Sequence, residues 1–237
     1  MTATRDVRAV FFDIGGPLYD DADFVSAVLT ALDEIRGERG LRAADRARFL
    51  RVYEDLRRSQ DTSLRARLAA EFLGGPEERD LLRERTRAYW RYPRGTLHID
   101  VLPCLRALHG KVRIGVIADR ESPVVDALAR DGAADLVDVW AVPARAATDE
   151  PDPDLLAWAL REVDVLADQA VHIGNRLDTD IRPARALGLG TIWVLRGEAP
   201  ADPTPEQLAE ADAAVTDLTS VPDLVFQLPL REVRTPS

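Results

Sequence analysis

The chain has 237 residues and a formal net charge of −10, from 31 basic and 41 acidic side chains. Its hydrophobic content of 46% is enough for a packed core, which excludes a disordered chain. The negative charge argues against nucleic acid or an anionic membrane as the main partner. The single cysteine, Cys104, excludes an internal disulfide and a cysteine-based zinc site. No apolar run reaches about 18 residues and no signal-peptide pattern is present, so we expect a cytoplasmic protein without a membrane span.

The first predicted element is a buried parallel strand at residues 8–13, an apolar run (RAVFFD) that ends at Asp13. A Gly-Gly-Pro turn follows it. Residues 20–95 then carry apolar side chains at helical spacing, which predicts four amphipathic helices with no strand among them. This segment holds 16 arginines and 15 acidic residues, a net charge of +1, whereas the rest of the chain carries −11. We therefore expect it to form the less negative wall of any cleft between the two parts.

From about residue 99 the pattern alternates between strands and helices, which is typical of a parallel sheet with helices on both faces. We predict strands at 113–118, 137–142, 170–174 and 191–195, and helices at 124–130, 154–163 and 181–187. The predicted fold class is therefore α/β, a Rossmann-like parallel sheet with an inserted helical domain. The expected division is 1–19 and 96–225 for the sheet domain, 20–95 for the helical insert and 226–237 for a C-terminal tail, with weak order after Val221.

In an open parallel sheet, the functional site lies beyond the carboxyl ends of the strands. Asp13 is the sharpest candidate there, because a carboxylate that ends an apolar strand before two glycines can act as a nucleophile or a metal ligand. Asp180 fits either a metal ligand or a helix N-cap. His172 lies between apolar residues of a predicted strand, and we expect it in the core.

The order of these parts resembles the haloacid dehalogenase (HAD) superfamily over about residues 6–220. The pattern consists of a strand ending in Asp, a helical insert, a strand ending in a small residue, a Pro-Asp-Pro helix start and a Gly-Asx…Asp segment. The resemblance implies a Rossmann-like core with a helical cap over the site. It also implies Mg²⁺-dependent hydrolysis of phosphate esters through an aspartyl-phosphate, although a minority of the family are metal-free dehalogenases.

Carried over to this sequence, the resemblance makes Asp13 the nucleophile. Two residues later the family's phosphatases have a second Asp as general acid/base, but here Gly15 offers only its carbonyl to a metal. In the last motif Asn175 replaces the first Asp and Asp180 keeps the second. The implied ligands of a weakened or absent Mg²⁺ are Asp13, Gly15, Asn175 and Asp180, and the implied substrate contacts are Gly16, Asp119, Arg120 and Asn175.

Two further motif positions are replaced: Ala118 stands where the family has Ser or Thr, and Glu150 stands where it has the lysine that faces the phosphate. The chain's one lysine, Lys111, precedes a strand and so lies at the wrong end of the sheet. An inward Glu150 would repel a phosphate by roughly 4 kcal/mol per unit charge at 4 Å and an effective dielectric near 20. Losing a positioned acid/base lowers a rate by about 10²–10⁴-fold. An arginine could replace the lysine as an oxyanion clamp; the candidates are Arg120, Arg145 and Arg176.

The sequence leaves three functions open: a HAD-type hydrolase with weak or lost phosphatase activity, a non-catalytic binding or regulatory scaffold, and a HAD fold used on a non-phosphate substrate. Dehalogenation is disfavoured, because the dehalogenases share the changes at Gly15 and Asn175 but keep the Ser and Lys that are replaced here. We expect a small-molecule ligand in the cleft and a monomer or homodimer. A basic insert wall would favour a phosphate, and an apolar wall would favour another substrate.

Overall fold

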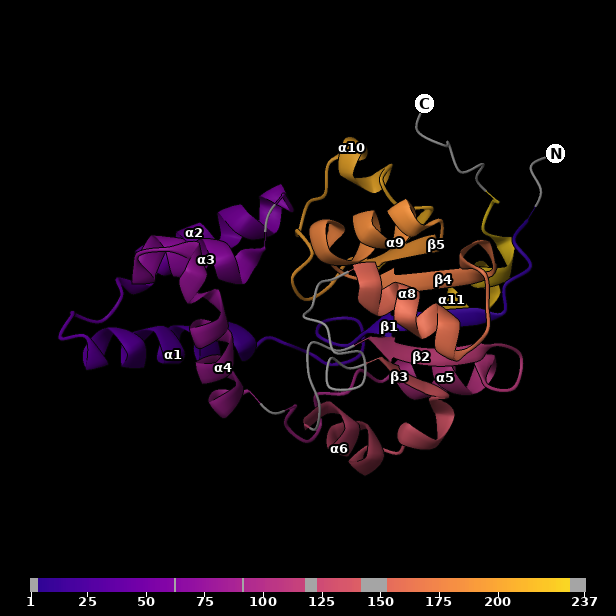
Figure 1. The fold of residues 1–237 in the computed structure, drawn as a ribbon, viewed down its shortest axis with the longest axis horizontal. Helices are drawn as coiled ribbons and strands as arrows, with labels where there is room; N and C mark the ends of the chain where they lie inside the picture. Colours follow the sequence, from indigo (N-terminus) through magenta and orange to yellow (C-terminus); the bar gives the residue numbers. More distant parts are fainter. Residues whose placement is uncertain (1–3, 62, 91, 118–122, 142–152, 231–237) are drawn as a thin grey trace.

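The computed structural model describes residues 4–61, 63–90, 92–117, 123–141 and 153–230. Within these ranges a parallel six-stranded sheet has the order β3-β2-β1-β4-β5-β6 (Figure 1). The strands are β1 (Ala9–Asp13), β2 (Arg113–Ile117), β3 (Val139–Ala141), β4 (Ala170–Gly174), β5 (Gly190–Val194) and β6 (Ala213–Val215). The chain adds β2 on one side of β1 and β4 on the other, which creates a topological switch point between β1 and β4, the usual place for a ligand site.

Helices cover both faces of the sheet, and β1 shows why. Its residues Ala9, Val10, Phe11 and Phe12 are all fully buried. Ala9 and Phe11 pack in one cluster with α8 (Pro153–Glu162) and α9 (Arg182–Leu187). Val10 and Phe12 pack in another, with α5 (Val101–Leu108), α6 (Pro123–Arg130) and α11 (Val221–Leu224). Because successive strand residues point to opposite faces, an unbroken apolar run supplies both layers.

The helical insert, residues 24–89, lies beside the sheet domain in Figure 1. It consists of α1 (Phe24–Glu38), α2 (Arg46–Ser59), α3 (Leu64–Leu73), a 3₁₀ turn (Pro76–Glu78) and α4 (Arg79–Tyr89). These helices bury their own hydrophobic cluster, which includes Val28, Leu32, Phe49, Leu68 and Leu82. Side chains cap two of the helices, since Asp45 accepts from the backbone N–H of Arg48 and Ser63 from that of Ala66.

The predicted α/β class with a helical insert is confirmed. The expectation of weak order after Val221 is wrong for residues 221–228, while residues 231–237 of the predicted tail lie outside the described ranges. Val221, Val225 and Leu228 are buried against the sheet domain, in α11, the 3₁₀ turn Val225–Gln227 and the residue after it. Their spacing of four and three residues places them on one helical face, a pattern too short to stand out in the sequence. The sequence reading also missed α5, β6 and the short α10 (Pro205–Leu208).

Two further boundaries differ from the prediction. The helix expected at 181–187 is preceded by a π-helical turn, Leu177–Ile181, and α9 itself begins at Arg182. The third strand is confined to Val139–Ala141, with residue 142 outside the described ranges. In the part of the chain that the structure describes, the helices are too short or too polar to cross a membrane.

Candidate active site

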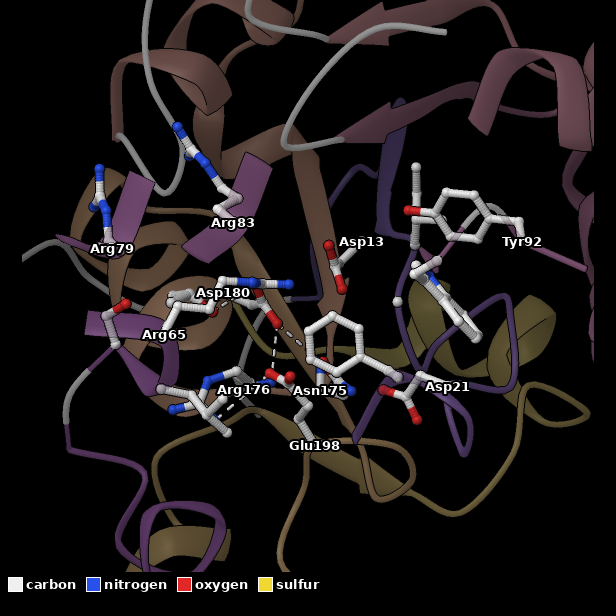
Figure 2. Close-up of a pocket in the computed structure, with 17 residues that line it drawn as sticks. Asp13, Asp21, Arg65, Arg79, Arg83, Tyr92, Asn175, Arg176, Asp180 and Glu198 are labelled. Atoms are coloured by element: carbon white, nitrogen blue, oxygen red, sulfur yellow. Dashed lines mark hydrogen bonds and ion pairs between the residues drawn. The ribbon is translucent and has the colours of Figure 1, made fainter. Parts of the chain in front are cut away.

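A pocket of about 150 Å³ lies where the helical insert meets the carboxyl ends of β1 and β4 (Figure 2). Its lining combines a wall from the sheet domain with a wall from the insert and the adjoining linkers. The sheet domain contributes Asp13, Gly15, Asn175, Arg176, Thr179, Asp180 and Glu198, among others. The insert and its linkers contribute Asp21, Phe24, Arg65, Arg79, Arg83, Trp90 and Tyr92, among others. The pocket therefore occupies the switch point between β1 and β4.

The turn after β1 brings Asp13 and Gly15 to the pocket and leaves Gly16 outside its lining. An ideal Cβ at Gly15 would have no heavy atom within 4 Å, so position 15 has room for a side chain. Gly16 differs, because its φ is +90° and an ideal Cβ there would lie 2.0 Å from Nδ2 of Asn175. Gly16 thus lets the turn pack directly against Asn175, and its predicted contact with substrate stays a prediction.

The turn after β4 is organised around Asp180. Its Oδ2 accepts the backbone N–H groups of Asn175 and Arg176, at 2.9 and 2.8 Å, and the Thr179 hydroxyl donates to its Oδ1 at 3.2 Å. Gly174 makes this fold possible, since an ideal Cβ there would lie 2.3 Å from the Cβ of Asp180. Burial raises the pKa of Asp180 to about 6, although the backbone hydrogen bonds oppose that rise. Asp180 therefore stabilises the preceding loop, at residues 175 and 176, and does not cap the following helix α9.

Asn175 is buried and held from two sides. Its Nδ2 donates to the carbonyl of Arg196 at 3.1 Å, and the indole N–H of Trp193 donates to the backbone carbonyl of Asn175 at 2.9 Å. Trp193 is fully buried in β5, so its hydrogen bond holds the backbone of Asn175 in place at the end of the sheet. Asn175 is consequently a rigid part of the pocket wall.

The expected magnesium ligands Asp13, Gly15, Asn175 and Asp180 all line the pocket. Both carboxylate oxygens of Asp180, however, already accept hydrogen bonds from the protein. Among the described residues there is no group of three or more His, Cys, Asp or Glu side chains that could hold a metal. Mg²⁺ requires near-octahedral oxygen ligands, and protein sites usually supply it with one or two carboxylates. Asp13, the Gly15 carbonyl, the Asn175 amide oxygen and the remaining lone pairs of Asp180 are the groups that would hold the ion, and the hydrogen bonds on Asp180 reduce what that carboxylate can offer.

Arg176 was one of the arginines considered as a replacement for the missing lysine. Its side chain is buried and its Nε lies 2.8 Å from Oδ1 of Asp178, with Nη1 3.7 Å from Glu198. These ion pairs join the guanidinium to its own loop and to the segment after β5. Five other residues that the sequence analysis discussed at the motif positions or as candidate arginines lie outside the described residues: Ala118, Asp119, Arg120, Arg145 and Glu150.

The insert wall is basic. Arg79 and Arg83 both contact the carboxylate of Asp80, at 3.0 and 3.1 Å, and Arg65 lies over the ring of Phe24 with 4.9 Å between guanidinium carbon and ring centroid. Sequence reasoning did not single out these arginines, because an arginine on an amphipathic helix usually lies on its solvated face. The one signal was the less negative charge of residues 20–95. Phe24 and Trp90 pack edge to face and add an aromatic side to this wall.

A family model for haloacid dehalogenase-like hydrolases matches residues 7–188. The chain belongs to this family. A crystal structure of a HAD phosphatase from Thermococcus onnurineus is similar over 92% of this chain and 98% of its own, with a TM-score of 0.62 and 18% identity. A 2-haloacid dehalogenase from Pseudomonas syringae is similar over 93% and 99%, with a TM-score of 0.57 and 22% identity. At these identities the two structures show the shared fold alone.

A curated relative gives a local match of higher identity. The phosphoserine phosphatase of Thermus thermophilus is 38% identical over 72 residues, which cover 30% of this chain and 27% of that protein. The chain thus spans only about a quarter of the relative's length in this match. The family model therefore shows a haloacid dehalogenase-like hydrolase, and the phosphatase match is confined to a local segment of the chain.

In this HAD-like hydrolase Asp21 is a pocket residue that sequence reasoning missed. It follows the β1 turn and lines the pocket together with Asp13 and Glu198. Burial, together with the charges of Glu198 and Asp20, raises the pKa of Asp21 to about 7, and the Arg57 guanidinium opposes that rise. Residue 21 is not one of the positions to which the resemblance assigns a role, so the sequence held no signal for it.

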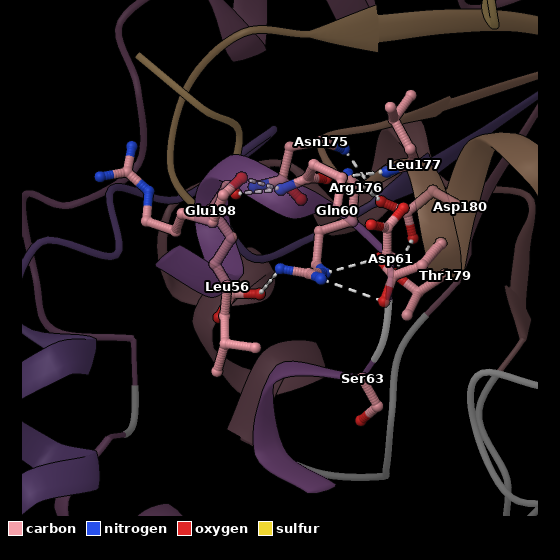
Figure 3. Close-up of polar contacts among 12 residues, drawn as sticks. Leu56, Gln60, Asp61, Ser63, Asn175, Arg176, Leu177, Thr179, Asp180 and Glu198 are labelled. Atoms are coloured by element: carbon pink, nitrogen blue, oxygen red, sulfur yellow. Dashed lines mark hydrogen bonds and ion pairs between the residues drawn. The ribbon is translucent and has the colours of Figure 1, made fainter. Parts of the chain in front are cut away.

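The HAD-like hydrolase also has a polar contact that joins the insert to the sheet domain (Figure 3). Gln60, at the end of α2, is fully buried and adopts a left-handed φ of 54°. Its Oε1 accepts the backbone N–H of Leu177 at 3.0 Å, and its Nε2 donates to the carbonyls of Arg57 and Glu198 at 2.8 and 2.9 Å. Arg182 of the sheet domain also donates to the Gln60 carbonyl, at 2.7 Å. One insert residue thus holds both the loop of Asp180 and the segment of Glu198.

Proposed function

We propose that this chain is a HAD-type hydrolase that cleaves phosphate esters of small molecules through Asp13, with residues 24–89 acting as its cap. The observation that carries the proposal is the pocket itself: Asp13 lies on one wall, and Arg65, Arg79 and Arg83 line the other. A wall of guanidinium groups suits the dianionic oxygens of a phosphate ester. The match to the HAD-like hydrolases and the local similarity to a phosphoserine phosphatase support the same reaction.

In the proposed reaction, a carboxylate oxygen of Asp13 attacks the phosphorus, and the ester P–O bond breaks with its electron pair on the leaving alkoxide. The alkoxide takes a proton from water. A second water then attacks the aspartyl-phosphate, which releases inorganic phosphate and restores the Asp13 carboxylate. Asp180 keeps the Asn175–Arg176 backbone in place beside the reacting group throughout.

Gly15 shapes this chemistry, because no side chain at that position can donate a proton to the leaving group. The rate should therefore depend strongly on how well the alcohol leaves unaided, so aryl phosphates should react faster than alkyl phosphates. Because Asp180 is already hydrogen-bonded by the protein, we also propose that Mg²⁺ binds weakly at this site.

The test is steady-state hydrolysis of a panel of aryl and alkyl phosphates, with and without Mg²⁺, by the wild type and by Asp13→Asn. Asn has the size of Asp but is not a nucleophile of comparable strength, so turnover should be lost in the variant while its thermal unfolding stays close to that of the wild type. The aryl esters should be the faster substrates. Turnover that persists unchanged in Asp13→Asn would show that the assignment is wrong.

A second candidate function is a non-catalytic scaffold that binds an anion, and Gly15 is the observation that favours it. It predicts that the wild type binds inorganic phosphate in the pocket but hydrolyses no ester of the panel. The same panel, followed by calorimetric titration with phosphate, separates the two functions.

A further inference from the structure

Arg196 follows β5 and binds the turn that carries Asp13 into the pocket. Its Nε donates to the carbonyl of Gly16 at 3.1 Å, and its Nη2 donates to the carbonyl of Pro17. Both carbonyls belong to the turn that leaves β1 directly after Asp13. A guanidinium is planar and presents its N–H donors in a fixed fork, so it holds two neighbouring carbonyls in a defined relative position. Arg196 therefore sets the course of the chain as it leaves Asp13.

The same residue also holds the other turn of the site. Its backbone carbonyl accepts a hydrogen bond from Nδ2 of Asn175 at 3.1 Å. Gly197 permits this close approach, because its φ is +64° and an ideal Cβ there would lie 2.7 Å from Cα of Gly16 and 2.7 Å from Nδ2 of Asn175. The segment after β5 thus packs against the turns that follow β1 and β4, and one residue binds both.

Asp100 fixes the guanidinium of Arg196 in turn. Its Oδ2 lies 2.9 Å from Nη1 of Arg196 and also accepts the backbone N–H of Leu218 at 2.6 Å. The side chains of Arg196 and Asp100 are 15% and 11% exposed, so salt screens this ion pair only weakly. Asp100 stands at the start of α5, where the chain has returned from the insert. The guanidinium is consequently held in one place by the sheet domain, and this allows it to hold the turn after β1.

We propose that Arg196 is a positioning residue for the reaction at Asp13, because its bonds to the carbonyls of Gly16 and Pro17 hold the carboxylate where it attacks the phosphorus. This inference rests on the proposed function. Arg196 is not part of the pocket lining, so its effect reaches the substrate through the turn and not through a contact of its own. A misplacement of about 1 Å in a reacting group can lower a rate by about 10²-fold. The loss of Arg196 should therefore lower kcat more than it raises KM.

The experiment compares Arg196→Gln with Arg5→Gln in the full-length protein. Arg5 is a matched control, because it is a buried arginine that donates to two backbone carbonyls, those of Asp168 at 3.1 Å and Gly188 at 3.0 Å. These carbonyls precede β4 and β5, at the edge of the sheet opposite the pocket. Both variants should lose stability, so both are assayed well below their unfolding temperatures. Arg196→Gln alone should lower kcat for an aryl phosphate, about ten- to hundredfold, with KM changed less than about threefold.

Arg196→Lys gives the second readout. Lysine keeps a positive charge beside Asp100 but presents no planar fork to the two carbonyls, so its kcat should fall between those of the wild type and Arg196→Gln. The third readout needs no turnover. The amide of Gly16 donates to the carbonyl of Tyr19 within the turn, and its hydrogen should exchange faster in Arg196→Gln than in the wild type.

The possible outcomes separate this inference from the proposed function. Hydrolysis that requires Asp13 but has the same kcat in Arg196→Gln overturns the inference and leaves the function standing. An equal loss of kcat in Arg5→Gln also overturns it, since general destabilisation is then the cause, and so does a change confined to KM. A wild type that hydrolyses no ester refutes the proposed function. In that case faster exchange at Gly16 in Arg196→Gln still supports the hold of Arg196 on the turn, and unchanged exchange overturns it.

Discussion

Gly16 packs directly against the side chain of Asn175, which lines the pocket. An ideal Cβ at Gly16 would lie 2.0 Å from Nδ2 and 2.9 Å from Cγ of Asn175, and the φ of Gly16 is +90°. The amide cannot move away easily, because it is buried and its Nδ2 donates to the Arg196 carbonyl. The two adjacent glycines of the β1 turn therefore have different roles, since Gly15 has open space in its Cβ direction.

The first prediction compares alanine at these two positions. Gly16→Ala should lower the free energy of unfolding by about 2 kcal/mol or more, because it combines a left-handed backbone with a clash against Asn175. Gly15→Ala should be nearly neutral, since its methyl group enters open space. Urea unfolding of both variants measures the difference, and equal stability losses would contradict this account of the turn.

The second prediction restores the side chain that the HAD phosphatases have at position 15. Gly15→Asp should fold, because nothing lies within 4 Å of the new Cβ, and should raise kcat for alkyl phosphates more than for aryl phosphates. A positioned general acid typically raises a rate by about 10²–10⁴-fold. We expect a gain in kcat near or below the lower end of that range, because the loop after β4 is not adapted to an acid at position 15. Gly15→Ala is the control for the added Cβ. If Ala and Asp give the same ratio of aryl to alkyl rates, proton donation is not what position 15 lacks.

The position of Asp13 could be predicted because two independent signals coincide there, an unbroken apolar run and an acid before two glycines. The roles of the insert residues Arg65 and Gln60 could not be predicted. Each lies in or next to a helix, and the apolar pattern of a helix shows only which of its faces is buried within the insert. Their function depends on which helix faces meet the sheet domain, and this information resides in contacts between distant residues. For Arg176 the sequence suggested a role that the structure does not favour. Its position after β4 suits an arginine that binds an oxyanion, but its guanidinium forms an ion pair with Asp178, two residues later.

The third prediction concerns the contact between insert and sheet domain at Gln60. Gln60→Gly relieves the left-handed backbone but removes the acceptor of the buried Leu177 N–H, so we expect a net loss of about 1–3 kcal/mol. The amide of Leu177 should also exchange its hydrogen faster. Gln60→Glu keeps an acceptor for that N–H but cannot donate to the Glu198 carbonyl, so Leu177 should stay protected while stability falls. Unchanged exchange at Leu177 in Gln60→Gly would show that the insert does not hold this loop.

The fourth prediction follows from Asp21, whose pKa in the folded protein is raised to about 7 from its ordinary value of 3.8. Between these values the native state binds a proton that the unfolded state has lost, so the contribution of Asp21 to stability falls as the pH rises from about 4 to 7. Below the lower value both states are protonated and the effect vanishes. Above the higher value both states are ionised, and the full penalty of the carboxylate beside Glu198 and Asp20 is present.

Asp21→Asn removes this titration. The variant should therefore be more stable than the wild type at pH 8, by an amount on the order of 2–4 kcal/mol, and the gain should shrink toward zero near pH 4. Asp23→Asn is the control, because Asp23 is exposed and its side chain makes no cap hydrogen bond to α1. Denaturant unfolding of the three proteins at pH 4, 6 and 8 gives the comparison. A gain from Asp21→Asn that is the same at all three pH values would mean that its cause is packing and not the buried charge.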